Sequence, residues 1–256
     1  GSGAQVIGGA AATTFNNLTI ANAGSGVSLG QNANVNGVLT LTNDLTTGAN
    51  IVTMPSTGTS TGTGDVIGNV RRTGFVGGGS ALSFGNPFNS IGFIAQGTVP
   101  TDVLVNLVKA APGGGTPFPT AVQRTYTITP TGGSGFSATL RLHYLDSELN
   151  GNIEAQLGLF RLGAVWVRQG RTGSVDTVNN WAELSGVTQF SAWTLSSQKN
   201  NSTTTITADT PDPSQQEQSV TVNFTVASAV AGAPQVTGNV TITVDDASGD
   251  TCTGNI

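Results

Sequence analysis

The first 67 residues alternate apolar and polar positions in short pieces separated by Asn- and Gly-containing turns. The sequence LTIAN at 18–22 recurs 21 residues later as LTLTN at 39–43. A period near 20 residues, with two or three short strands in each repeat, is typical of a β-solenoid, whose coils stack on one another. The same strands also allow a plain antiparallel meander. The sequence therefore predicts a short solenoid or β-helix-like module over 1–67, with the meander as the alternative.

The interior of this solenoid follows from the alternation. Apolar side chains at every second position of a strand point to one face, so these should fill the narrow interior. The predicted interior residues are Phe15, Leu18, Ile20, Val27, Leu29, Val35, Leu39, Leu41, Leu45 and Ile51.

Residues 68–198 predict a second module rich in strands and aromatic side chains. Apolar–polar alternation recurs at intervals that suit a β-sandwich. Gly151 and Gly158 favour a loop over a helix between 147 and 159. The expected core contains Leu140, Trp166, Trp181, Phe190 and Trp193. The predicted strands are 66–72, 102–109, 123–129, 137–145, 157–162, 164–169, 181–184 and 190–195.

The last segment, 199–256, follows a polar linker that begins at Lys199. It predicts strands at 203–207, 219–227 and 238–245. An immunoglobulin-like sandwich has about seven strands, so these few would leave their apolar faces partly uncovered. The predicted fold class is therefore all-β, with a short solenoid, a β-sandwich and an incomplete Ig-like β-sandwich.

Composition and charge limit the classes of function that the chain can have. Only 9% of the residues are charged, against roughly 25% in an ordinary soluble domain, and Gly numbers 36. A net charge of −5 and a pI near 4.6 argue against nucleic acid as a partner, because phosphate binding needs clustered Lys and Arg. A membrane-spanning helix needs about 20 consecutive apolar residues, and the sequence contains no such run. The low Lys content and the abundance of Thr and Asn favour an extracellular location.

Three stretches carry a resemblance. The segment from FNNLTIANAG to GANIVTM resembles the β-solenoid modules of large bacterial surface and secreted proteins. The phrases LRLHYLDSELNGNIEAQLGLFRL and WVRQGRTGSVDTVNNWAELSG resemble the domain that often follows such modules. The stretch TTTITADTPDPSQQEQSVTVNFTV, 203–226, resembles the bacterial immunoglobulin-like repeat.

The resemblance implies an architecture of stalks, fibres and adhesins, and it transfers no functional residue. The immunoglobulin-like repeat usually continues beyond the equivalent of Ile256 with further strands and a second Cys. The resemblance therefore implies a fragment lacking those strands, and a partner for Cys252 downstream. If the chain ended at Ile256, Cys252 would be free or joined to another subunit.

A weak metal candidate lies near the end of the chain. Asp245, Asp246 and Asp250 crowd one acidic stretch, and calcium takes about six to eight oxygen ligands, often from closely spaced Asp. Their spacing matches no EF-hand, so a solvated acidic loop is the competing interpretation. No other cofactor is predicted.

Catalytic candidates are sparse. His143 lies in a predicted strand without a nucleophile or orienting partner in an informative position, which favours a structural role. Asp146 and Glu148 could form a carboxylate pair for glycoside hydrolysis. Thr-x-Thr at 40–42 and the Thr residues of 57–63 could bind ice or glycans, but they are irregular. We therefore predict that the chain is not an enzyme, with a polysaccharide-active enzyme as a remote alternative.

The leading hypothesis is a structural subunit of an extracellular bacterial filament or surface stalk that self-associates into a homopolymer. The alternative is an adhesin that binds cell-surface glycans or proteins through loops around Trp166, Arg168, Arg171 and Trp181.

Filament assembly would use β-edge or strand-complementation contacts. In one version, residues 1–15 donate a strand to the incomplete C-terminal sandwich of a neighbour. In the competing version, these residues begin or cap their own solenoid.

Overall fold

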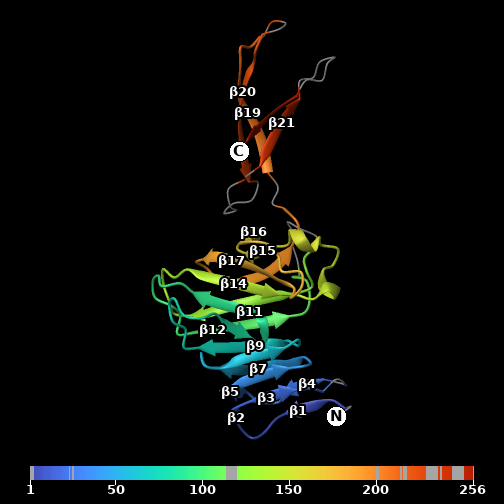
Figure 1. Cartoon of the computed structure of the whole chain (residues 1–256), viewed down its shortest axis with the longest axis vertical. Helices are drawn as coiled ribbons and strands as arrows, with labels where there is room; N and C mark the ends of the chain where they lie inside the picture. The colour runs from blue at the N-terminus through green and yellow to red at the C-terminus, as the bar shows by residue number, and fades with distance from the viewer. Residues whose placement is uncertain are drawn as a thin grey trace. The chain divides into compact units, whose positions relative to one another are not determined.

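The computed structural model describes residues 3–22, 24, 26–113, 120–199, 202–213, 215, 218–228, 236, 238–243 and 251–255. The chain forms two compact units, Gly1–Gln198 and Lys199–Ile256. Strands dominate both units, which confirms the all-β prediction (Figure 1). Helical structure in the described residues is confined to two 3-10 turns, η1 (Asp146–Glu148), which overlaps the start of the predicted loop, and η2 (Glu154–Gln156), which lies inside it.

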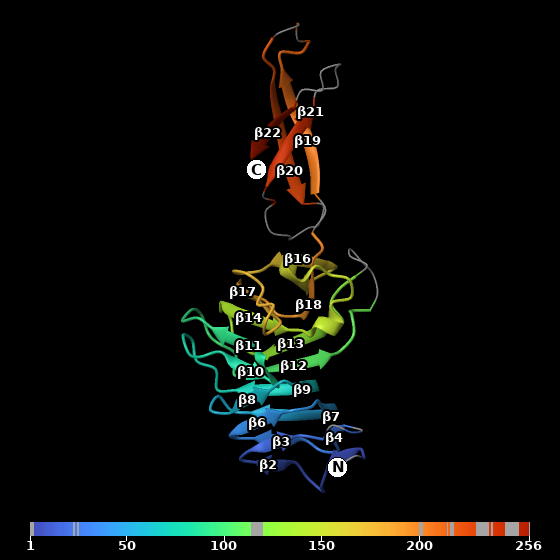
Figure 2. The same cartoon turned by 45° about the vertical axis from the view of Figure 1, so that its right-hand side comes forward.

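The first part of the larger unit is a parallel β-solenoid, as the repeat predicts. Strands of successive coils stack in three parallel columns, β1–β4–β7–β9, β2–β5–β7 and β3–β6–β8 (Figure 2). In the third column Leu18 pairs with Leu39, one 21-residue repeat later, and Leu39 pairs with Ser60. The parallel pairing excludes the meander. The strands are β1 (Gln5–Ile7), β2 (Thr13–Phe15), β3 (Leu18–Ile20), β4 (Val27–Leu29), β5 (Ala33–Val35), β6 (Val38–Leu41), β7 (Leu45–Met54), β8 (Thr59–Gly62) and β9 (Val66–Thr73).

Most of the predicted interior is buried, and Phe15 and Leu18 pack partly buried against the core. Ile51 is the exception, because it is only half-buried while Val52 and Met54 point inward. The register of β7 shifts between Thr46 and Ile51, so the alternation changes phase within one strand. The predicted residues that are buried are Ile20, Val27, Leu29, Val35, Leu39, Leu41 and Leu45.

Asn and Asp side chains continue the hydrogen-bond ladder at the corners of the coils. The amide of Val38 donates to Asn17 Oδ1 at 2.8 Å, and the amide of Ile51 donates to Asn32 Oδ1 at 2.9 Å. Backbone groups that leave a strand column need such partners. Close stacking also selects glycine, since a Cβ at Gly64 would lie 2.5 Å from the carbonyl oxygen of Asn43 in the coil below.

Residues 5–15 occupy the first coil of their own solenoid. β1 pairs with β4 and β2 pairs with β5 in the same chain. The structure therefore corresponds to the second alternative for this segment, in which its backbone hydrogen bonds are made within the chain. Because β1 and β2 are paired within their own solenoid, this segment is not free to donate a strand to a neighbouring subunit.

Beyond the solenoid, the same sheet continues as one layer of a β-sandwich. β9 pairs in parallel with β7 on one edge and antiparallel with β12 on the other. This layer runs β9–β12–β13–β18–β15–β16, and the second layer runs β10–β11–β14–β17. The strands are β10 (Leu82–Phe84), β11 (Asn86–Phe93), β12 (Asp102–Val108), β13 (Thr125–Thr131), β14 (Ala138–His143), β15 (Gly158–Leu162), β16 (Trp166–Gly170), β17 (Trp181–Val187) and β18 (Ala192–Ser196).

The prediction omitted β10 and β11, whose sequence mixes Ser, Gly, Asn, Pro and Phe without clean alternation. Every other strand of the sandwich overlaps a predicted one. The core prediction is confirmed for Leu140, Trp166 and Trp193, which are buried. Phe190 packs partly buried against the core, while Trp181 is half-buried beneath the guanidinium of Arg141 at 3.8 Å.

The solenoid and the sandwich lie in the same compact unit, Gly1–Gln198. One hydrophobic cluster extends from Ile20 to Leu195, and the predicted boundary at 67/68 falls inside β9. The physical reason is that β9 hydrogen-bonds to both parts, so no linker separates them. The predicted boundary at 198/199 coincides with the division between the two compact units. We call the region where β9 joins the coils to the sandwich the junction.

The second unit consists of two antiparallel strand pairs, β19–β20 and β21–β22. β20 alternates exposed and half-buried positions, and Ile206 on β19 is 60% exposed. The predicted uncovered apolar faces are therefore present in its described residues. β22 was not predicted, and the predicted strand end at 244–245 lies outside the described residues. The strands are β19 (Ser202–Thr210), β20 (Thr221–Ser228), β21 (Asn239–Thr243) and β22 (Thr251–Asn255).

Candidate functional site

A buried cluster of charged and polar side chains lies at the junction. Asp65 immediately precedes β9 and Arg124 immediately precedes β13, and both are 1% exposed. His143 ends β14, and Glu148 lies in η1; both are also buried. The topology thus brings together groups from the last solenoid coil and from both layers of the sandwich.

Arg124 is the centre of this cluster. Its Nη1 and Nη2 donate to the two carboxylate oxygens of Asp65 at 3.1 and 2.6 Å, a bidentate pair, while its Nε donates to Glu148 Oε2. Nη1 also lies 3.2 Å from Tyr126 Oη and 3.3 Å from His143 Nδ1. The Tyr126 hydroxyl donates to the backbone carbonyl of His143 at 2.6 Å. Planar guanidinium geometry suits such multiple pairing.

Lys109 extends the cluster toward the surface. Its Nζ lies 2.9 Å from Asp65 Oδ2 and 2.7 Å from Asp44 Oδ2. The other oxygen of Asp44 accepts the backbone amide of Asp65 at 2.8 Å. Both carboxylates belong to solenoid coils, whereas Lys109 follows β12 of the sandwich. Ion pairs therefore link the two parts of the larger unit directly.

The electrostatics favour the ionised forms of Asp65 and Arg124. Burial alone raises the pKa of Asp65, but a hydrogen bond from His143 and the charge of Arg124 outweigh burial and hold that pKa far below its usual range. Burial lowers the pKa of Arg124, yet its neighbours Tyr126 and Asp65 raise it above the ordinary value. Burial raises the pKa of the Tyr126 hydroxyl, which stays protonated at neutral pH.

This arrangement is suited to holding structure rather than to acid–base chemistry. The carboxylates of Asp65 and Glu148 are both engaged by Arg124, and Asp65 also pairs with Lys109. A hollow of about 340 Å³ beside the cluster is lined by Lys109 and Asp44 but not by Arg124 or Asp65. Removing one partner from a buried ion pair typically costs about 3–5 kcal/mol.

The structure separates the candidate carboxylate pair. Glu148 pairs with Arg124 and accepts the amide of Leu145 at 2.9 Å, whereas Asp146 is exposed and accepts Asn180 Nδ2 at 2.9 Å. His143, predicted to have a structural role in a strand, ends β14 and lies in the charge cluster. Sequence reasoning missed Asp65 and Arg124, although alternation places Arg124 on the same strand face as Tyr126 and Ile128.

The calcium candidates Asp245, Asp246 and Asp250 lie outside the described residues, and so does the side chain of Cys252. Within the residues that the structure describes, no three His, Cys, Asp or Glu side chains gather as a metal site would require. Of the Thr residues considered for ice or glycan binding, Thr40 and Thr61 lie on adjacent coils with their Oγ1 atoms 3.0 Å apart.

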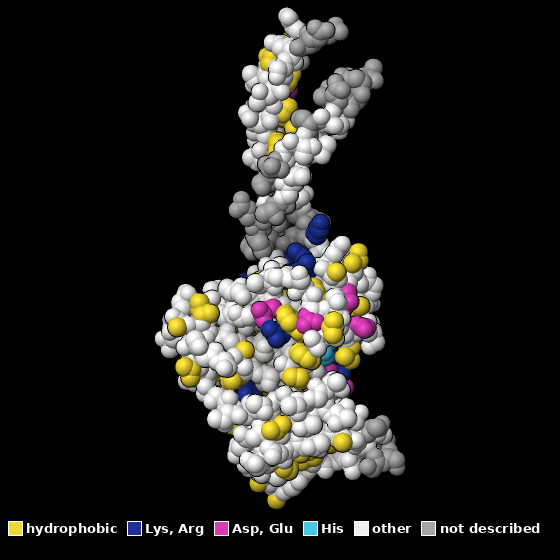
Figure 3. All heavy atoms as spheres, viewed as in Figure 1, with side chains coloured by type: hydrophobic (Ala, Val, Ile, Leu, Met, Phe, Trp, Pro, Cys, Tyr) yellow, Lys and Arg dark blue, Asp and Glu magenta, His cyan; other side chains and the backbone are white. Residues whose placement is uncertain are grey.

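The surface expected of an adhesin presents little aromatic area. Trp166 is 5% exposed, Trp181 is covered by Arg141, and Arg171 donates to the carbonyl of Leu157 at 2.8 Å. Figure 3 shows a face of the larger unit with few charged side chains and scattered hydrophobic ones. No helix in the described part of the chain is long and apolar enough to cross a membrane.

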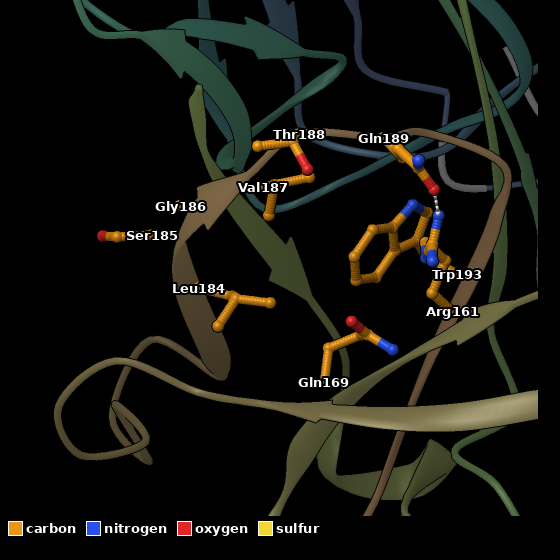
Figure 4. A pocket seen from close by; sticks show the side chains of 9 residues that line it. All are labelled: Arg161, Gln169, Leu184, Ser185, Gly186, Val187, Thr188, Gln189 and Trp193. Atoms are coloured by element: carbon orange, nitrogen blue, oxygen red, sulfur yellow. Dashed lines mark hydrogen bonds between the residues drawn. The ribbon is translucent and has the colours of Figure 1, made fainter. Parts of the chain in front are cut away.

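A separate hollow of about 170 Å³ lies between the sandwich strands (Figure 4). The indole of Trp193 faces Leu184 and Val187 across it, and Arg161 donates to Gln189 Oε1 at 2.6 Å on one side. Trp193 is itself 1% exposed, and its Nε1 has no hydrogen-bond partner.

No protein-family model, curated protein or solved structure matches the chain.

Proposed function

We propose that this chain is a structural module of an extracellular filament or surface stalk. The observation that carries the proposal is the junction: one sheet passes through it without interruption, and the buried pairs of Asp65 with Arg124 and Lys109 link its two sides. A stalk must keep its parts aligned under load. Parallel coils that continue into a sandwich through shared backbone hydrogen bonds suit that requirement.

Surface properties support the same proposal. A sparsely charged surface gives little like-charge repulsion between closely packed subunits. β3 pairs with β6 on one edge, and among the described residues its other edge has no strand partner, so a further coil can stack there. Among the described residues β19 and β20 pair only with each other, so their outer edges can likewise accept an added strand. Homopolymer assembly through such edges is part of the proposal.

Single-molecule force spectroscopy tests the load-bearing role. The larger unit should unfold in one cooperative step, because the solenoid and the sandwich share a sheet and a core. Arg124→Met should lower the unfolding force or split the step, whereas the control Arg161→Met, at a half-buried position outside the cluster, should change the force much less. Separate low-force steps for the solenoid and the sandwich in the unaltered chain would contradict the proposal.

Electron microscopy of the purified protein tests assembly and separates this function from the adhesin alternative. Filaments are expected from a fibre subunit, and an extended module within larger surface projections is expected from a stalk. Monomers that bind members of a glycan array would favour the adhesin. Turnover of a polysaccharide would favour the enzyme.

A further inference from the structure

Arg72 is a second buried arginine, and its surroundings differ from those of Arg124. It lies on β9, is 1% exposed and points into the solenoid interior in register with Met54. Its Nη2 donates to the carbonyl of Gly58 at 2.6 Å, and its Nη1 lies 3.3 Å from Met54 Sδ. Among the described residues no carboxylate pairs with it, and its Nε has no hydrogen-bond partner. The guanidinium therefore carries an uncompensated charge.

This arginine lines a groove of about 360 Å³ between the last solenoid strands and the second sandwich layer. The lining is rich in hydroxyl groups and contains no Asp or Glu. Ser60 is 7% exposed, and its buried hydroxyl lacks a partner, as does Arg72 Nε. Buried donors without partners are costly, so a ligand that accepts from them is favoured. The hydroxyl-bearing lining residues include Ser56, Ser60, Ser83 and Ser90.

A second cation borders the same groove. Arg141 contributes to the lining, and its Nε and Nη2 donate to Glu183 Oε2 at 3.0 and 2.8 Å. Stacking on Trp181 at 3.8 Å helps to fix its position. Burial lowers the pKa of Arg72 to about 10, so this arginine remains charged at neutral pH. The lining residues thus carry positive charge, fixed donors and hydroxyl groups.

We propose that this groove binds an oxyanion, such as the carboxylate or sulfate group of an acidic sugar. Arg72 and Ser60 supply donors to the anion, while the remaining serines suit the hydroxyl groups of the ring. Charge-assisted hydrogen bonds from a guanidinium are among the strongest a protein offers to such groups. The volume falls in the range of small-ligand pockets, roughly 300–1,000 Å³.

The competing explanation is that Arg72 only supports the Gly58 carbonyl. That role predicts a change in stability but no ligand. The neighbouring Arg71 provides a matched control: it lies on the same strand, is half-buried and does not line the groove. Its Nε is also buried without a hydrogen bond, but it has a counter-charge, Asp102 Oδ1 at 3.4 Å. Arg71→Gln removes the same unit of charge from a position outside the site.

The experiment titrates the full chain with sodium sulfate, glucuronate and, as a neutral control, glucose. Calorimetry measures affinity, and nitrogen-15 NMR follows the Nε–H signal of Arg72 at constant ionic strength. Sulfate or glucuronate should bind saturably and shift that signal, while glucose should not. Arg72→Met should weaken binding by about tenfold or more, and Arg71→Gln should not, since a charged hydrogen bond contributes about 1.5–3 kcal/mol.

Glucuronate binding tighter than sulfate would assign the groove to acidic sugars, and the reverse order would assign it to inorganic anions. If Arg72→Met fails to fold, Arg72→Lys keeps the charge but loses the planar fork, and it should still weaken binding. The proposal is overturned if neither anion binds saturably. It is equally overturned if both arginine positions contribute alike, which would indicate only general charge attraction.

Discussion

Arg72 and Arg124 are both buried arginines at the junction, yet their surroundings are opposite. Arg124 is enclosed by Asp65 and Glu148, and its donors have acceptors. Arg72 lines an open groove, has no carboxylate partner among the described residues and leaves Nε unpaired. The difference teaches that burial of a charge has two uses here. A neutralised charge links segments of the fold, while an uncompensated charge beside a groove invites a ligand.

The largest expected effect is the loss of the Arg124 cation. Arg124→Met leaves the buried carboxylates of Asp65 and Glu148 without their main partner, so the free energy of unfolding should fall by about 3–5 kcal/mol. Urea unfolding followed by tryptophan fluorescence measures this. Arg161→Met, at a half-buried position outside the cluster, should cost no more than about 1 kcal/mol, the worth of its hydrogen bond to Gln189. If Arg124→Met lowered the free energy of unfolding by less than about 1 kcal/mol, stabilisation of the fold would not distinguish Arg124 from Arg72.

Acid should weaken the Arg124 cluster through Asp65. The folded-state pKa of Asp65 lies below its unfolded value of about 3.9, so this group contributes stability above that pH. The contribution is lost as the pH falls from about 4 toward the folded-state pKa. Urea unfolding at pH 7 and pH 3 should show a stability loss about 1 kcal/mol larger in the unaltered chain than in Asp65→Asn. Equal losses in both chains would show that Asp65 does not carry the acid sensitivity.

Arg72→Met should change stability much less than Arg124→Met. The substitution removes a buried charge that lacks a counter-charge, which offsets the lost hydrogen bond to Gly58, so we expect a change within about 1 kcal/mol of either sign. The same urea experiment measures it. A loss as large as that of Arg124→Met would mean that Arg72 is mainly structural and would weaken the case for a ligand groove.

The smallest effect is expected at the solvent-facing end of the cluster. Asp44→Asn removes the ion pair with Lys109 but can retain the acceptor for the Asp65 amide, and exposed pairs contribute about 0–1 kcal/mol. Thermal unfolding should therefore show a shift of a few degrees at most, and added salt should reduce the difference further. A difference insensitive to salt would show that this pair behaves as a buried one.

The repeat at 18–22 and 39–43 was sufficient to predict the solenoid, because stacked coils need equivalent positions one period apart. Strict alternation identified most strands of the sandwich for a similar reason. Ile51 was assigned to the wrong face, because a register shift inside β7 changes the phase without an unambiguous sequence signal. β10 and β11 were missed, since their polar and small residues acquire partners only within the folded sandwich.

The local sequence pattern gave little indication of the charge cluster. Alternation places Arg124 with Tyr126 and Ile128, and Arg72 with Val70, so inward-facing arginines could have been noticed. Nothing local distinguishes the two, because the partners of Arg124 lie far away in the chain; Asp65 is 59 residues distant. The sequence also suggested separate modules at 67/68, where the structure has one continuous strand.

The sequence by itself determined the all-β class, the coil period and most strands, because these depend on side-chain alternation and turn residues within short segments. Only the tertiary structure decided that β9 pairs on both edges, that Asp65 and Glu148 neutralise Arg124, and that Arg72 lines a groove without a counter-charge. Such outcomes depend on contacts between distant segments. Local patterning predicts which face a side chain occupies, but not which group will meet it there.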